Sequence, residues 1–119
     1  MQHAFHVVAS RFAADHDLAQ WLFAALDAVL EEAEVTRPVQ DGEGETIWID
    51  FGGDRYRVAA TRDAPAQQPT WRVLVAHAEP TFVRSRNKRH QARLDALVGT
   101  IRTILLTPPD ISLIAEHDD

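Results

Sequence analysis

The six histidines are the side chains whose chemistry we consider first, because imidazole can bind metal ions and transfer protons near neutral pH. The best cluster combines His3 and His6 with the run Asp15-His16-Asp17. Residues three apart in a strand point to opposite faces, so His3 and His6 cannot both reach one ion. Asp15 and Asp17 are also suited to cap a helix and to carry charge in its first turn. We therefore predict no metal site and no cofactor.

The sequence also contains no motif for a serine nucleophile, a reactive thiolate or a phosphate-binding loop. Ser10, Ser85 and Ser112 lie outside any Gly-x-Ser-x-Gly elbow. The chain has no cysteine, which removes thiolate nucleophiles, thiolate metal sites and disulfides. Gly52-Gly53 lies between two strand-like runs and not before a helix. It is therefore typical of a hairpin turn and not of a phosphate-binding loop. No catalytic residue is predicted, but an enzyme with a small-molecule pocket near His77 stays open, because folding can gather distant polar groups.

One group of residues favours binding to another protein. An indole, three guanidinium groups and an aliphatic side chain should share the outer face of the predicted sheet. They are Trp48, Arg55, Arg57, Arg72 and Leu74. Tryptophan and arginine are enriched at the energetic centres of protein interfaces. The alternative is an ordinary solvated face whose arginines are screened by Asp50 and by neighbouring strands.

Charges also crowd the unfavourable ends of both predicted helices. The carboxylates at the C-terminal end of the first helix are Glu31, Glu32 and Glu34. The cations around the start of the second helix are Arg84, Arg86, Lys88, Arg89 and Arg93. Both sets oppose the helix macrodipole, at a cost of a few tenths of a kcal/mol or more per charge. Antiparallel neighbouring helices would let the two sets face each other, whereas parallel helices would leave the basic set for an anionic partner.

Two helices are predicted from the spacing of apolar residues. From residue 15 these residues recur at steps of three and four. They are Leu18, Trp21, Leu22, Ala25, Leu26, Val29, Leu30 and Ala33. The second helix begins at Ser85 and ends before Pro108-Pro109. Its apolar positions are Leu94, Leu97, Val98, Ile101, Ile104 and Leu105.

Strands are predicted from alternation and turn residues. Runs on both sides of Gly52-Gly53 predict a hairpin over residues 46–61, in which Phe51 pairs with Asp54. This register puts four apolar side chains on one face: Ile47, Ile49, Tyr56 and Val58. On the other face it sets Asp50 opposite Arg55 as an ion pair and Trp48 opposite Arg57 as a cation–π pair. Residues 4–9 and 71–77 add strands, and residues 111–115 an optional last one.

The expected fold is α+β, with the order β-α-β-β-β-α(-β). A three-strand meander lies at the centre of an antiparallel sheet, and both helices pack on one face. At 119 residues, the chain has the length of one globular domain, with polar loops at 36–45 and 62–70 and an acidic tail at 116–119. The residues expected in the core are Leu22, Leu26, Val29, Ile47, Ile49, Val58, Val73, Leu97, Val98 and Ile101.

Composition narrows the class of protein. The net charge of −6 disfavours generic nucleic-acid binding, and no apolar run is long enough for a membrane span. The lack of cysteine and of a secretion signal leads us to expect a cytoplasmic protein. The leading hypothesis is a small acidic module, immunity-protein-like or of chaperone or adaptor type, that binds a protein partner without catalysis. Self-association, nucleic-acid binding through the basic helix start and the pocket enzyme are the alternatives.

Overall fold

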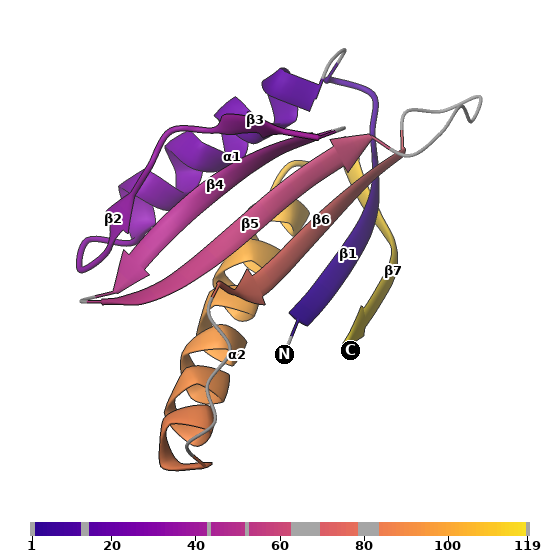
Figure 1. Cartoon of the computed structure of the whole chain (residues 1–119). Coiled ribbons are helices and arrows are strands. Elements are labelled where there is room, and N and C mark those ends of the chain that lie inside the picture. Colours follow the sequence, from indigo (N-terminus) through magenta and orange to yellow (C-terminus); the bar gives the residue numbers. More distant parts are fainter. Residues whose placement is uncertain are drawn as a thin grey trace.

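A computed structural model describes residues 2–12, 15–42, 44–51, 53–62, 70–78 and 84–118, with the side chains of residues 15 and 84–90 left aside. The elements in chain order are β1 (Gln2–Ala9), α1 (Asp15–Val29), β2 (Glu34–Val35), β3 (Val39–Asp41), β4 (Gly44–Phe51), β5 (Asp54–Arg62), β6 (Thr70–His77), α2 (Arg84–Leu106) and β7 (Ile111–Asp118). Figure 1 shows the described strands as one twisted sheet.

The sheet is antiparallel and has seven strands in its described part, in the order β2-β4-β5-β6-β1-β7, with β3 also paired to β4. The meander β4-β5-β6 lies at its centre, as predicted. Strand β1 comes first in the chain but inserts between β6 and β7. The predicted α+β class is therefore confirmed. The pairing of β1 with β6 and β7 could not be predicted from a local sequence pattern.

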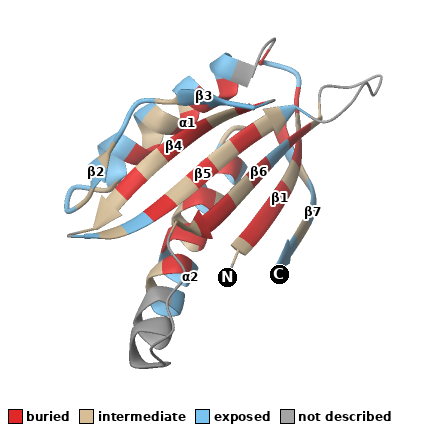
Figure 2. Cartoon of the chain, viewed as in Figure 1, coloured by how far each residue is buried: buried red, intermediate tan, exposed pale blue. Residues whose placement is uncertain are grey.

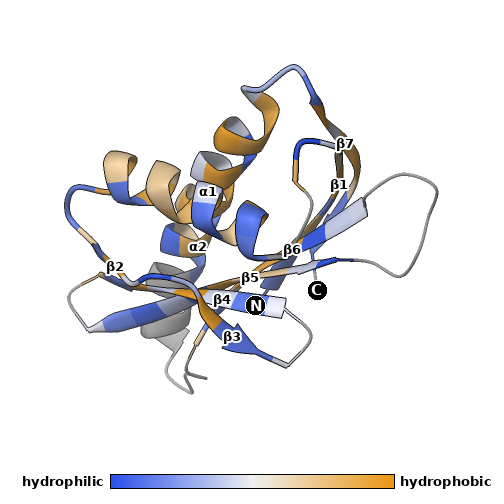
Figure 3. Cartoon of the chain, turned by 90° about the horizontal axis from the view of Figure 1, so that it is seen from above, coloured by the Kyte–Doolittle hydropathy of each residue, from blue (hydrophilic) through white to orange (hydrophobic). Residues whose placement is uncertain are grey.

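Both helices lie on the same face of the sheet, which Figure 3 shows from above. This arrangement buries the apolar stripe of each helix against the inward residues of the strands. Leu22 and Leu26 of α1 and Ile101 of α2 are fully buried, as are Phe5, Trp71 and their neighbours in the core. Along the strands, Figure 2 shows buried residues alternating with more accessible ones. Burial alternates with a period of two residues because successive residues of a strand point to opposite faces of the sheet.

The predicted hairpin register is confirmed at every position from Ile47–Val58 to Phe51–Asp54. The predicted side-chain pairs across it are wrong. Arg55 lies over the indole of Trp48 at 4.5 Å, one diagonal step from its expected partner. Asp50 instead accepts a hydrogen bond from the Gly53 amide at 2.7 Å. The carboxylate thereby stabilises the turn, where Gly53 has a φ of 103°.

Three further expectations are corrected. Val29 is 56% exposed and not part of the core, because α1 ends at this residue. The segment predicted as a polar loop at 36–45 contains β3 and the start of β4. The predicted acidic tail at 116–119 continues β7 as far as Asp118, paired with β1. The loop predicted at 62–70 lies mostly outside the described residues, and its ends belong to β5 and β6.

Candidate functional site

The side of the sheet opposite the helices, here called the outer face, gathers all five residues of the predicted protein-binding set. Directly paired residues of neighbouring strands point to the same face, so the registers place each side chain. One row across the sheet is Trp48–Arg57–Ala76–Gln2, the next is Thr46–Ala59–Leu74–Ala4–His117, and the third is Gly44–Thr61–Arg72–His6–Ala115. Neither described helix covers these rows (Figure 1).

An arginine–tryptophan contact marks one corner of the outer face. The guanidinium carbon of Arg55 lies 4.5 Å from the centre of the Trp48 ring, and Trp48 is only partly buried. A cation over an indole is attracted by the ring quadrupole, which holds both side chains in one conformation. An aromatic residue that is already ordered loses less entropy when a partner binds.

The middle of the outer face is apolar and is bordered by cations. Ala4 and Ala76 are only 5% and 4% exposed, although neither described helix covers them. Leu74 pairs directly with Ala4, Arg57 pairs directly with Ala76, and Arg72 lies in the row on the other side of Leu74. The arrangement resembles the anatomy of an interface, with an apolar centre and a polar rim.

Sequence reasoning found the Trp48 and Arg57 side of this face and missed the other side. His6 and Ala4 join it only because β1 pairs with β6, more than sixty residues away in the chain. His6 stacks on His117 of β7 with ring centres 5.2 Å apart. The alternation of residues 4–9 already separated Phe5 and Val7 from His6, and this was the one local signal.

The predicted anion-binding set is described only in part. Arg84, Arg86, Lys88 and Arg89 belong to α2, but their side chains lie outside the described ones. Arg93 donates to the carbonyl oxygen of Phe51 at 3.1 Å and pairs with the carboxylate of Asp54. The charge of Arg93 is therefore compensated within the fold, which weakens its case as a phosphate ligand.

The ring contact that the structure gives for His77 is with an aromatic side chain. The His77 ring packs edge-on against Tyr56 at 5.1 Å, and Tyr56 packs in the same way against Phe51 at 5.7 Å. Tyr56 is fully buried, whereas His77 is half-buried at the end of β6. Phe51 lines a cavity whose described lining residues do not include His77 or Tyr56.

His3 and His6 point to opposite faces, as their spacing requires. His3, buried under α2, lies between two carboxylates of β7, with its Nε2 2.7 Å from Glu116 and its Nδ1 hydrogen-bonded to Asp118. Arg102 of α2 donates to the same Glu116 oxygen. Hydrogen bonds from Arg102, and then from His3, hold the pKa of Glu116 below its ordinary value of 4.5. This network pins α2, β1 and β7 together.

The network predicts an acid-dependent loss of stability. A carboxyl whose pKa is lowered on folding contributes stability that is fully present above its unfolded pKa and is lost as pH falls through the folded value. We expect Glu116→Gln to lower the free energy of unfolding at pH 7 and to flatten its fall below about pH 4.5. Urea unfolding at a series of pH values measures both effects. Glu31→Gln, at an exposed position, is the control, and parallel curves for wild type and Glu116→Gln would contradict the assignment.

The remaining residues of the histidine cluster serve α1. His16 Nδ1 lies 3.0 Å from Glu45, and this hydrogen bond raises the pKa of His16 above 6.5. Glu45 belongs to the face of β4 that lies under the helices, so the contact fastens the first turn of α1 to the sheet. Among the residues that the structure describes, no three His, Asp or Glu side chains are placed to hold a metal ion.

No protein-family model, curated protein or solved structure matches the chain. In the part of the chain described above, neither helix combines the length and the hydropathy needed to cross a bilayer.

Proposed function

We propose that this chain is a non-enzymatic binding module, of the immunity-protein, chaperone or adaptor type, whose outer face holds an acidic protein partner. The observation that carries the proposal is the gathering of Trp48, three arginines and Leu74 on the sheet face that no described helix covers. A two-layer fold leaves one sheet face open, and a face built for solvent alone gains little from the partly exposed side chains of Trp48 and Leu74.

The charge of the outer face favours a partner with an acidic patch. Arg55 and Arg57 of β5 and Arg72 of β6 all lie on this face, whereas the chain as a whole carries a net charge of −6. A second copy docked by the same face would bring its three guanidinium groups against these three, which disfavours a symmetric dimer. The overall negative charge likewise disfavours an extended polyanion such as nucleic acid.

We expect Trp48→Ala to weaken partner binding at least about tenfold while lowering the free energy of unfolding by no more than about 1 kcal/mol. The indole is partly exposed and its identified contact is the surface contact with Arg55, so its loss removes partner contacts more than core packing. Affinity purification of the tagged chain from its native host, followed by titration of the recovered partner, measures the first effect. Urea unfolding measures the second.

Leu106→Ala is the matched control, because Leu106 is a large apolar residue that is 48% exposed at the end of α2, away from the outer face. Partner binding should survive this change and be lost with Arg57→Glu. Equal loss in Trp48→Ala and Leu106→Ala would reject the outer face. Recovery of nucleic acid that dissociates steeply with added salt, or a dimer abolished by Trp48→Ala, would replace the proposal with one of its rivals.

A further inference from the structure

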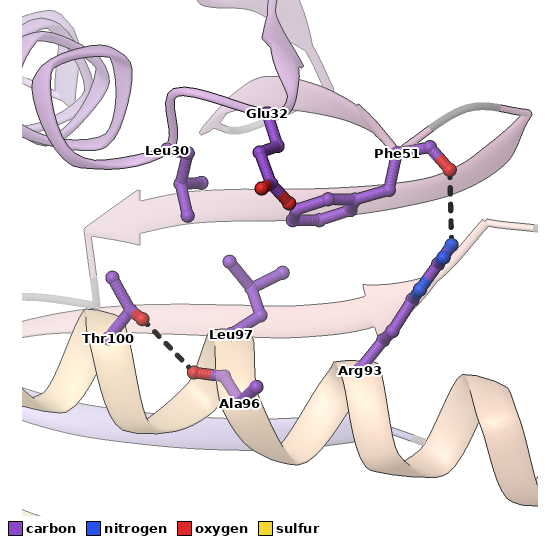
Figure 4. A pocket seen from close by; sticks show the side chains of 7 residues that line it. All are labelled: Leu30, Glu32, Phe51, Arg93, Ala96, Leu97 and Thr100. Atoms are coloured by element: carbon purple, nitrogen blue, oxygen red, sulfur yellow. Dashed lines mark hydrogen bonds between the residues drawn. The ribbon is translucent and has the colours of Figure 1, made fainter.

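A cavity of about 450 Å³ lies on the helix side of the sheet, where the C-terminal end of α1 meets the middle of α2. Its lining residues are Leu30, Glu32, Phe51, Arg93, Ala96, Leu97 and Thr100. Figure 4 shows side chains from both sides of the cavity pointing toward one another. The volume falls within the range of small-ligand sites, which run from about 300 to 1,000 Å³.

The walls of the cavity are mainly apolar. Leu30 and Phe51 form one side and Leu97 with Ala96 the other, and Leu30 and Phe51 are only partly buried. The hydroxyl of Thr100 donates to the carbonyl oxygen of Ala96 at 3.1 Å, so it is already engaged within α2. An occupant would therefore gain from an aromatic or branched aliphatic body more than from many hydrogen bonds.

The charged groups around the cavity leave it with a net negative charge, contributed by a carboxylate. Arg93 brings one positive charge, but its guanidinium pairs with Asp54 and donates to the Phe51 carbonyl oxygen. Glu32 brings a negative charge, and its carboxylate points toward the Phe51 ring (Figure 4). Counting Arg93, Asp54 and Glu32 together leaves one net negative charge.

The end of α1 adds to this negative potential. The last turn of α1 contains no basic residue, and Leu30 follows it directly. The C-terminal end of a helix carries a partial negative charge that attracts cations. Glu32, one of the three acidic residues that looked misplaced in the sequence, thus lines a cavity whose opposite wall is residues 93–100 of α2.

We propose that this cavity binds a small amphipathic amine, which has one ammonium group and an apolar aromatic or branched aliphatic body. The ammonium group pairs with Glu32 beside the end of α1, and the body packs between Leu30, Phe51 and Leu97. A carboxylate ligand would meet repulsion from Glu32 and would have to compete with Asp54 for Arg93.

Three probes of one shape test the proposal: phenethylammonium, the neutral 2-phenylethanol and the anionic 3-phenylpropionate. Each is titrated into the isotope-labelled full chain and followed by two-dimensional NMR. We expect saturable amide shifts at Leu30, Phe51 and Ala96, with the amine binding about three to ten times tighter than the alcohol. The carboxylate should bind weakest.

Glu32→Gln should remove the preference for the amine over the alcohol, because the ring contacts remain while the ion pair is lost. Glu31→Gln is the matched control, since Glu31 is a neighbouring exposed carboxylate that does not line the cavity. Both positions are exposed, so neither change should disturb folding. The proposal is overturned if the amine gives no saturable shifts at the lining residues, if the carboxylate binds tighter, or if the two variants behave alike.

Discussion

Replacing Leu26 or Ile101 by alanine is expected to lower the free energy of unfolding by about 2–5 kcal/mol. Both side chains are fully buried, Leu26 in the stripe of α1 and Ile101 in that of α2. Each truncation removes apolar contacts and leaves a cavity that close-packed neighbours fill only in part. Urea unfolding followed by circular dichroism measures both variants under the same conditions.

Val29→Ala provides the internal control for this comparison. Val29 lies three residues after Leu26, close to the same helical stripe, and yet it is 56% exposed at the last residue of α1. Its truncation should cost less than about 0.5 kcal/mol, as expected for a surface substitution. If Val29→Ala cost as much as Leu26→Ala, the end of α1 would have to pack more deeply than the structure shows.

The contrast between Leu26 and Val29 also shows how far periodicity alone can predict a core. Spacing identifies which side of a helix faces the sheet, and Leu22, Leu26 and Leu30 of the predicted stripe all belong to the core or pack against it, whereas Val29 does not. Spacing contains no information about where the covering sheet stops. Val29 is exposed because of tertiary arrangement, which a residue pattern within the helix cannot report.

The hairpin was predictable because both of its strands and its turn are adjacent in the chain. Two glycines and two alternating runs fixed the register through Phe51 and Asp54. The side-chain partners on the outer face were not fixed, because a long arginine can reach the opposite residue or its diagonal neighbour. Arg55 reached Trp48 diagonally, while Asp50 was already engaged by the turn amide of Gly53.

The last strand was predicted as an option over residues 111–115 and is present as β7, but its continuation to Asp118 was not predicted. Residues 116–118 are acidic and have low strand propensity, so they are typical of a solvated terminus. In the fold, Glu116 and Asp118 meet His3 from β1, and Glu116 also meets Arg102 from α2. These partners stabilise residues 116–118 as part of the sheet. They come from the N-terminal strand and from the preceding helix, so a local sequence pattern does not contain them.

The cavity beside Glu32 could not be predicted either, because Leu30, Phe51 and Leu97 come from three separate elements. The sequence did contain one relevant signal, the acidic residues at the C-terminal end of α1. They oppose the macrodipole, and proteins tolerate such a local cost most readily where function requires it. The face proposed to bind a protein and the cavity proposed to bind an amine lie on opposite sides of the sheet, so each can be tested in a variant that spares the other.

Gly44→Ala is expected to lower the free energy of unfolding by about 1–3 kcal/mol, although it adds only a methyl group. Gly44 is buried at the start of β4, opposite Thr61. A Cβ there would lie 2.6 Å from the Thr61 hydroxyl oxygen and still closer to the backbone carbonyl oxygen of Ala60. A carbonyl oxygen held in a sheet cannot swing aside as a flexible side chain can, so β4 and β5 would have to separate locally.

The same substitution at Gly99 should have the opposite sign. Gly99 lies in the middle of α2, and among the described residues a Cβ at this position would have no neighbour within 4 Å beyond its chain neighbours and the backbone of its own helix. Alanine lowers the entropy of the unfolded chain and favours the helix, so Gly99→Ala should raise the free energy of unfolding by about 0.5–1 kcal/mol. Urea unfolding measures the free energy of unfolding of both variants and of wild type. Gly44→Ala tests the packing at the start of β4, and Gly99→Ala tests whether that side of α2 is open. Stabilisation by Gly44→Ala would mean that β4 does not approach β5 as closely as the structure places it, whereas a loss at Gly99 would place an unseen neighbour against α2.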